Sequence, residues 1–522
     1  MHGRGTGTPL LQLICLDLSS WPGYGRYVGP FPKFLYHQTK LESIDLSNSN
    51  ITGMTTMLVT NNITHLNSLS LSNCSLSGHF RIPIHQEYHP HENLKTLDVS
   101  TNDFSPSPIL PDICAFFPNI GHISLSDNKF YGEIPPQLSN CSPFEILDVS
   151  NNQLSGEIPR WIWNMSTGSI QDLSQNKFSG HLPPGFISPL MHEVYLSRNQ
   201  LEGTLPATLS DKYSIGVLDL SHNHLMGTIP KWIGGLRQLS YIFLNDNQFH
   251  GDLPYTFCLE TSKLIDVSHN HLSGHISYEI FTSNGTNCNG RNAYDNPQRD
   301  MEFVTKTKTY TYHGWPLYYM NGLDFSSNNF TGEIPPQIGH LGNTKVLNFS
   351  YNMFTGPIPL TIANLSQIES LDLSHNNLGG VIPSQITELH SLSTFSVAYN
   401  NLSRKCPQKV AQFSTFDEDI FEGNPLLNCT LPFMTPNTLV RPTPYIGDEE
   451  GEGGFIDMES FYVSGSVSYV MVLLVIASVL HINPYWRRVW FYCIDVTITT
   501  CYYFVVDHLP VPTKYKVWEP RF

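Results

Sequence analysis

The sequence predicts an α/β-type solenoid, which is a superhelix of short repeats, with one island insertion and then one transmembrane helix. The first observation is a motif, Leu-x-x-Leu-x-Leu-Ser-x-Asn-x-Leu-x-Gly-x-Ile-Pro, that recurs along most of the chain. The second is a gap of 58 residues between two of its asparagines, where the usual period is 24. The third is a run of 22 residues, 461–482, without Asp, Glu, Lys or Arg.

The repeats are registered on their asparagines. Successive asparagines are 23 or 24 residues apart before the gap and 24 apart after it. A fixed period in this range is typical of a solenoid in which each repeat buries its apolar face against its neighbours. The asparagines are Asn128, Asn152, Asn176, Asn199, Asn223, Asn247, Asn270, Asn328, Asn352, Asn376 and Asn400.

One repeat, residues 239–254, illustrates the expected local structure. Leu239, Ile242 and Leu244 alternate with other positions, which predicts a short strand with one buried side. Asn247 then ends the strand, and its amide is expected to bond backbone groups that a tight bend leaves unpaired. Gly251 permits the next bend, and a proline begins the outer segment. Stacked strands would form a concave parallel sheet.

The earlier repeats match the motif less well. Asn102 is in register, whereas Cys74 and Ser49 occupy the preceding asparagine positions, and a strand at residues 13–18 opens the array. Gln171 stands at an apolar position in one later repeat. With these repeats included, we expect eleven repeats before the interruption and four after it.

The interruption adds about 34 residues, which lie roughly at 277–319. Glycines and asparagines mark irregular chain at its start, and its end, MEFVTKTKTYTYHGWPLYY, is rich in Thr, Tyr and Lys. This end predicts a strand that packs back onto the solenoid. Insertions in repeat arrays often build the binding surface.

Ligand recognition is therefore expected at the island and on the neighbouring concave strands. Aromatic and cationic side chains gather there, and aromatic side chains dominate binding hot spots. The alternative is that the tyrosines only pin the island to the solenoid. The candidate ligand-binding residues are Tyr195, Tyr241, Phe243, Lys306, Lys308, Tyr310, Tyr312, His313 and Trp315.

Charge, cysteines and glycosylation triplets limit the possible classes of function. The chain has 522 residues and a formal net charge of −16, which argues against a nucleic-acid partner. No CxxC metal spacing occurs, and Cys406 and Cys429 flank the end of the solenoid, where we expect them to pair. Eleven Asn-x-Ser/Thr triplets suit a glycosylated surface, although the repeat's own use of Asn and Ser also produces such triplets. They are Asn50, Asn62, Asn73, Asn140, Asn164, Asn284, Asn329, Asn348, Asn364, Asn401 and Asn428.

Residues 461–482 are expected to cross a membrane once. At about 1.5 Å per residue the run spans roughly 33 Å, which covers a bilayer core. Arg487 and Arg488 follow at once, so the positive-inside rule places the C-terminus in the cytosol and the solenoid outside. A buried core helix is the alternative. Only 40 residues follow the run, too few for a kinase domain, and Cys493 and Cys501 are candidate palmitoylation sites.

An acidic stretch precedes the apolar run. A run of charge is usually a solvated spacer, but these carboxylates could also attract a partner with a basic juxtamembrane segment. Two serines in the apolar run form a small-residue face that a partner helix can approach closely. The candidate partner-binding residues are Asp448, Glu449, Glu450, Glu452, Asp457, Glu459, Ser464 and Ser468.

The sequence does not predict an enzyme, a metal site or a cofactor site. His222, His269 and His375 each precede a repeat asparagine at a variable exposed position, which the repeat pattern explains. Eight aspartates share one strand position, and paired carboxylates could imitate a glycosidase site. An even column without a cleft is better explained as a solvated consensus feature. The column comprises Asp45, Asp98, Asp148, Asp172, Asp219, Asp266, Asp324 and Asp372.

Together these features resemble the plant leucine-rich-repeat receptor-like proteins, which lack a kinase domain. Nine repeats end in Gly-x-(Ile/Leu)-Pro, as in the plant-specific class of leucine-rich repeat, and the resemblance covers roughly residues 41–407. The strand MNGLDFSSNNFTGEIP, the cap FEGNPLLNC and the tail RRVWFYCIDVTITTCYYFVVD are similar to that family. The chain departs from the family at its start, where a signal peptide and a cap are missing, so we expect an N-terminally truncated sequence.

The resemblance implies a single-pass type I receptor of the plasma membrane without enzyme activity of its own. It would bind an extracellular peptide, protein or glycan ligand. It would signal, in plant defence or development, by recruiting an adaptor receptor-like kinase and a co-receptor kinase. No cofactor is implied. The alternatives are an extracellular cell-wall-binding or enzyme-inhibitor protein built from the same repeats, and a truncated, non-functional receptor product.

The expected organisation follows the boundaries of these features along the chain. It comprises a degenerate N-terminal region with a partial repeat (1–40), leucine-rich repeats (41–276), the island insertion (277–319), four further repeats (320–407), a C-terminal cap (408–447), an acidic juxtamembrane stretch (448–460), the transmembrane helix (461–482) and a short cytoplasmic tail (483–522).

Overall fold

The computed structural model describes residues 12–429, apart from 20–27, 31, 53–63, 81–89, 142–143, 165–168, 184–190, 207–214, 237, 258, 260–261, 283–293, 295–296 and 409. The expected acidic stretch and the expected membrane segment, with their candidate partner-binding residues, lie outside these ranges. Within the described part of the chain, no helix has both the length and the apolarity needed to cross a bilayer.

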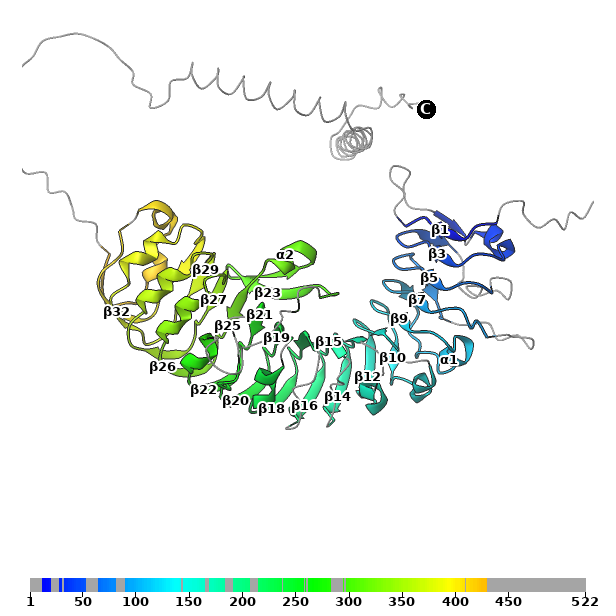
Figure 1. Ribbon diagram of the computed structural model, residues 1–522, viewed down its shortest axis with the longest axis horizontal. Coiled ribbons are helices and arrows are strands. Elements are labelled where there is room, and N and C mark those ends of the chain that lie inside the picture. Colours follow the sequence, from blue (N-terminus) through cyan, green and yellow to red (C-terminus); the bar gives the residue numbers. More distant parts are fainter. Residues whose placement is uncertain are drawn as a thin grey trace, which may run out of the picture. The chain divides into compact units, whose positions relative to one another are not determined.

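Fifteen short parallel strands, one from each repeat, form a single sheet whose order follows the chain. Figure 1 shows this sheet along the inner side of the solenoid. Eleven strands precede the island and four follow it, as expected, and β21 pairs directly with β25 across the insertion. The strands are β1 Cys15–Asp17, β3 Ser43–Asp45, β5 Ser68–Ser70, β7 Thr96–Asp98, β9 His122–Ser124, β11 Ile146–Asp148, β13 Ser169–Asp172, β15 Met191–Tyr195, β17 Val217–Asp219, β19 Tyr241–Phe243, β21 Leu264–Asp266, β25 Gly322–Asp324, β27 Val346–Asn348, β29 Ser370–Asp372 and β31 Thr394–Ser396.

A second parallel sheet of nine strands follows the same repeats. Its glycines hold the left-handed backbone that the bend requires; Gly251, for example, has φ 79°. The strands are β10 Tyr131–Gly132, β12 Gln153–Glu157, β14 Lys177–His181, β16 Gln200–Thr204, β18 His224–Gly227, β20 Gln248–Asp252, β22 His271–His275, β26 Asn329–Glu333 and β28 Met353–Thr355. Smaller sheets join β2 Val28–Pro30 to β4 Asn50–Thr52, β6 Ser77–Gly78 to β8 Asp103–Phe104, and β30 Gly379–Gly380 to β32 Asn401–Lys405 and β33 Leu426–Asn428.

Short helices form much of the remaining segment of each repeat. The proline of the Gly-x-(Ile/Leu)-Pro ending directly precedes several of them, as at Pro135, Pro230 and Pro359, because its fixed φ suits a helix start. The 3-10 helices are η1 Lys33–His37, η2 Pro136–Asn140, η3 Arg160–Asn164, η4 Lys231–Gly235, η5 Tyr278–Phe281, η6 Pro336–His340, η7 Leu360–Asn364, η8 Ser384–Glu388, η9 Ala411–Thr415 and η10 Glu418–Phe421; α1 spans Ile113–Phe116.

The repeat asparagines bond the backbone as the sequence predicts. The Asn223 side chain donates to the carbonyls of Leu196, Leu220 and Ser221 at 3.0–3.1 Å, and its Oδ1 accepts from the Leu201 amide at 3.0 Å. One buried amide thus serves two neighbouring repeats. Where a cysteine replaces the asparagine, the buried Cys74 thiol donates to the carbonyl of Leu46 at 3.0 Å.

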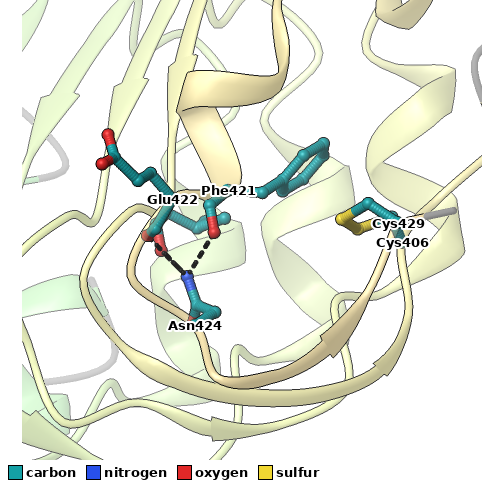
Figure 2. The surroundings of a disulfide bond; sticks show 6 residues. Cys406, Phe421, Glu422, Asn424 and Cys429 are labelled. Atoms are coloured by element: carbon teal, nitrogen blue, oxygen red, sulfur yellow. Dashed lines mark hydrogen bonds between the residues drawn. A yellow bond between two sulfur atoms is a disulfide. The ribbon is translucent and has the colours of Figure 1, made fainter.

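At the end of the solenoid, the hydrogen bonds made by the repeat asparagines continue for one more repeat. Asn424 lies 24 residues after the last repeat asparagine, and it donates to the carbonyls of Val397, Phe421 and Glu422. Figure 2 shows these last two bonds beside the disulfide that joins Cys406 to Cys429, whose Cα atoms are 4.9 Å apart. The disulfide therefore ties the end of β32, in the last repeat, to the end of β33, in the cap.

A second disulfide joins two neighbouring repeats on the side of the short helices. Cys114, in α1, is bonded to Cys141, directly after η2, with Cα atoms 4.7 Å apart. The sequence did not predict this pair, because spacing alone does not define disulfide connectivity.

Candidate functional site

The island forms a β-hairpin over the inner sheet. β23 Met301–Thr305 and β24 Lys308–Tyr312 pair in antiparallel fashion, and α2 Gly314–Tyr318 leads back to β25. Figure 1 shows β23 and α2 on the inner side of the sheet. The first residues of the range expected for the island form η5, the outer helix of a repeat, so the insertion begins after it.

A hydrophobic cluster separate from the main core attaches the hairpin to the sheet. Phe303 and Met301 of β23 pack with Tyr195, Tyr241 and Phe243 of the inner strands. These inner-strand side chains are 4%, 0% and 5% exposed. The island thus covers the apolar patch that the strands would otherwise present to solvent.

Two glycines make room for island aromatic rings. A Cβ atom on Gly216, just before β17, would lie 2.1 Å from Cγ of Tyr294. A Cβ atom on Gly322, in β25, would lie 2.5 Å from Cε1 of Phe303. Two non-bonded carbon atoms cannot lie this close together. Each ring therefore occupies space that is open only because the neighbouring residue is glycine.

Glu193 is a buried polar attachment point for the island. Its side chain is 0% exposed and lies in β15. It accepts hydrogen bonds from the Tyr294 hydroxyl at 2.7 Å, the Gln298 amide at 3.0 Å and the Tyr195 hydroxyl at 2.8 Å. A buried carboxylate is tolerated when such donors surround it, so this arrangement specifies where the island lies.

Ion pairs fasten both ends of the hairpin. Nη2 of Arg299 lies 2.6 Å from Oδ2 of Asp148, and Nε of Arg299 lies 3.5 Å from Oδ2 of Asp172. Arg198 pairs with Glu302 at 2.7 Å. At the hairpin turn, Lys306 pairs with Glu369 at 3.3 Å.

Between the hairpin and the sheet lies a cavity of about 920 Å³. Its described lining contains ten carboxylate side chains but only two guanidinium groups, those of Arg198 and Arg299. Thr307, Thr309 and Thr311 line the hairpin side. We call this cavity the acidic groove; its negative charge favours a cationic ligand.

The aspartate column forms the floor of the groove, and the expectation that it is solvated is wrong for part of it. Four members, Asp148, Asp172, Asp266 and Asp324, are only 2–6% exposed because the island covers them. Each accepts from the backbone amide and hydroxyl of the serine two residues later; for Asp172 these bonds from Ser174 are 3.1 and 2.6 Å long. Burial and the neighbouring Asp148 raise the pKa of Asp172 to about 7.

The candidate ligand-binding residues divide into two groups. Tyr195, Tyr241 and Phe243 are buried under the island, where they pack with Met301 and Phe303. This burial favours the alternative that aromatic side chains pin the island; a direct role in ligand binding stays a prediction. The others lie on β24, its turn or α2: Lys306 is ion-paired, Tyr312 donates to Thr305 Oγ1, and the exposed ones are Lys308, Tyr310, His313 and Trp315.

Exposed aromatic rings gather on α2. Trp315 is 73% exposed and stacks on Tyr319, with ring centroids 6.0 Å apart. Tyr318 meets Tyr319 edge to face, and Nζ of Lys263 lies 5.0 Å from the Tyr318 ring centroid. An exposed aromatic group of this kind on a soluble surface is typical of a binding site. Tyr318 and Tyr319 extend the set expected from sequence.

Sequence reasoning missed the residues that hold the island. Three of these residues stand in repeats, at positions where the motif does not specify them: Glu193, Gly216 and Gly322. The fourth, Arg299, lies in the insertion, outside the repeats. Two features of the sequence could have indicated them: a glycine at the start of an inner strand, and a single glutamate within an inner strand.

The candidate glycosylation sites differ in exposure. Asn348 is an inner-sheet residue whose amide donates to Asp324 Oδ2 at 3.0 Å inside the groove, a position that does not suit a glycan. Asn73 is half-buried and donates to Asn48. Asn62 and Asn284 lie outside the described residues. The exposed candidates are Asn50, Asn140, Asn329, Asn364, Asn401 and Asn428.

Comparisons with family models identify the repeats directly. Models described as leucine-rich repeat match residues 189–249 and, separately, residues 119–141, 144–165, 320–341, 343–365 and 367–389. These matches lie on both sides of the island, so the array is one repeat type interrupted once.

Known proteins with similar sequences are plant receptors. Cuscuta receptor 1 of Solanum lycopersicum is 55% identical over 227 residues, which are 42% of this chain and 20% of that protein. Receptor-like protein 18 of Arabidopsis thaliana is 28% identical over 359 residues, 65% of this chain and 35% of that protein. The chain thus spans about a fifth to a third of the length of these relatives.

Solved structures of plant receptor ectodomains share the fold. The crystal structure of PEPR1-AtPEP1 is 25% identical with a TM-score of 0.52, covering 73% of this chain and 55% of that chain. A TDR receptor structure has a TM-score of 0.58 at 21% identity, covering 76% of this chain and 65% of that chain. The second likeness concerns the fold alone.

Proposed function

The chain is a plant leucine-rich-repeat receptor-like protein, and from this premise we propose that it is a cell-surface receptor whose island and inner sheet bind an extracellular peptide. The observation that carries the proposal is the island itself. It is held in one place by an apolar cluster, a buried glutamate and three sets of ion pairs. A surface loop without a role would not require so many separate attachments.

The arrangement suits a peptide more than a flat protein surface. The acidic groove runs beneath the hairpin, and its walls carry serine and threonine hydroxyls that can bond a peptide backbone. The exposed rings of Trp315 and Tyr319 lie on the same island and offer rigid contact area at low entropic cost. The similarity to Cuscuta receptor 1 supports a receptor role.

We propose that signalling depends on recruited receptor kinases, a role that the similarity to receptor-like proteins supports. The acidic stretch at residues 448–459 would attract an adaptor kinase with a basic juxtamembrane segment, over about 8–10 Å at physiological salt. Ser464 and Ser468 would allow close helix contact. Co-precipitation with a variant in which the six acids become Asn or Gln tests the charge; undiminished pairing would leave the helix as the determinant.

The proposed ligand site is tested with an exposed-aromatic variant. The full chain, expressed behind a secretory signal in leaves, is exposed to fractions of extracellular extracts while calcium influx is recorded. Trp315→Ala combined with Tyr319→Ala should abolish the response of the unmodified chain at equal surface level. Tyr278→Ala, which removes a 57% exposed ring from η5, is the matched control and should respond normally. Equal responses from all three would contradict a ligand site on the island.

A further inference from the structure

Within the described part of the chain, two carboxylates on the floor of the acidic groove form no ion pair, although an equivalent pair does. Asp266 and Asp324 are partners across β21 and β25, as Asp148 and Asp172 are across β11 and β13. Arg299 lies between the second pair and contacts both carboxylates. No ion pair between described residues involves Asp266 or Asp324.

One oxygen of Asp266 accepts no hydrogen bond from the described residues. Asp266 is 4% exposed, and its Oδ1 accepts from the amide and the hydroxyl of Ser268 at 2.9 and 2.6 Å. Among the described residues nothing donates to its Oδ2, although the side chain lines the groove. Asp324 is better satisfied, since Asn348 donates to its Oδ2 at 3.0 Å. Asp266 Oδ2 is therefore a free acceptor in the groove, and a cationic donor from a ligand would form a charge-assisted hydrogen bond with it.

We infer that the Asp266–Asp324 pair is a subsite for a guanidinium group, supplied by an arginine of the peptide ligand. This inference rests on the proposed function and names the side chain that the groove selects. A guanidinium has two donor edges in one plane, so it can bridge carboxylates on neighbouring strands about 4.8 Å apart. Arg299 demonstrates, within the same groove, that a guanidinium fits between two such aspartates.

The groove favours an arginine over a bound metal ion. Among the described residues, no group of three or more His, Cys, Asp or Glu side chains is placed to hold a metal. Oxygen-binding cations such as Ca²⁺ require six or more ligands, whereas a guanidinium is satisfied by a few acceptors. The excess of carboxylates in the lining would also draw a cationic peptide toward this floor.

The test uses N-acetyl-L-argininamide as the probe and the full chain in detergent. Binding is measured by saturation-transfer NMR, with N-acetyl-L-citrullinamide as the neutral control of the same shape. The argininamide should bind and the citrullinamide should not. Asp266→Asn should weaken argininamide binding tenfold or more. Asp98→Asn, which has the same serine contacts but does not line the groove, should leave it unchanged.

The Asp266→Asn variant is expected to fold. Asn348 occupies the equivalent position in β27, and its Oδ1 accepts from the amide and hydroxyl of Ser350 at 3.1 and 2.8 Å. An amide is therefore already compatible with this strand position. An unchanged circular dichroism spectrum and thermal midpoint of the variant serve as the folding check.

Three outcomes would overturn the inference. They are equal binding of both probes, binding insensitive to Asp266→Asn, and displacement of the argininamide by millimolar CaCl₂ at constant ionic strength. Because the probe assay uses no signalling readout, it separates the two proposals. A receptor that responds through Trp315 but fails here loses only the arginine subsite.

Discussion

The guanidinium of Arg299 lies 2.6 Å from the carboxylate of Asp148, which precedes it by 151 residues. This contact joins the island to β11, the sixth inner strand before the insertion, whereas the hairpin's apolar contacts lie on nearer strands. The island is therefore fixed at two separated places, and a hairpin held at two places cannot pivot about either one. This rigidity is what a preformed ligand site requires.

Arg299→Gln should loosen the island while the repeats stay folded. The substitution leaves two buried aspartates without their cation, and hydrogen bonds to charged groups contribute about 1.5–3 kcal/mol. Amide hydrogen exchange in β23 and β24 should become about tenfold faster or more. Arg198→Gln is the control, because its pair with Glu302 is 45% and 50% exposed, and exposed pairs contribute about 0–1 kcal/mol. Equal exchange in the two variants would show that Arg299 does not hold the island.

Gly216→Ala should displace Tyr294 from the inner sheet. The new methyl group would overlap the ring, and overpacking of this kind costs about 1–3 kcal/mol. We expect loss of the Tyr294–Glu193 hydrogen bond and faster exchange in the hairpin. Gly121→Ala is a matched control: Gly121 precedes β9 as Gly216 precedes β17, and its added Cβ would meet nothing within 4 Å. A normal island in Gly216→Ala would refute the packing argument.

The repeats were predictable because their determinants are local, and the island site was not. Asn247 and Gly251 act within one bend of the chain, so a fixed spacing reveals them. Glu193 and Tyr294 interact across 101 residues, and nothing in either local sequence specifies the other. The burial of Tyr241 likewise depends on which inner strands the hairpin packs against. The sequence thus predicted a strand that packs back onto the solenoid, but not which aromatic rings it would bury and which would remain exposed.

Asn223→Ala should destabilise the repeat array. Three carbonyls and one amide lose their partner in a buried bend, which costs about 1–3 kcal/mol. Thermal unfolding of the full chain should therefore begin at lower temperature. The control is Asn377→Ala, which changes an exposed residue directly after the repeat asparagine Asn376. It should leave the thermal midpoint unchanged. If both variants had the same unfolding midpoint, the hydrogen bonds of the repeat asparagine would not be what stabilises the bend.

Stability should fall as pH rises from about 4 to 7. Burial raises the pKa of Asp172 from 3.8 to about 7, so the folded protein keeps this proton at pH values where the unfolded chain has lost it. Between these two pKa values the folded state binds more protons, and the free energy of unfolding decreases with increasing pH. A tenfold change in an acid dissociation constant corresponds to about 1.4 kcal/mol, so an effect on the order of 1 kcal/mol or more is expected.

The pH effect can be assigned with two substitutions. Asp172→Asn should flatten the dependence of the unfolding midpoint on pH between about 4 and 7, because the amide has no proton to lose. Burial and neighbouring carboxylates also hold the pKa of Asp266 above its usual value, so part of the slope should remain. Asp98→Asn, at the same strand position but outside the groove, should keep the full slope. A slope that Asp172→Asn leaves intact would mean that the island does not desolvate this carboxyl.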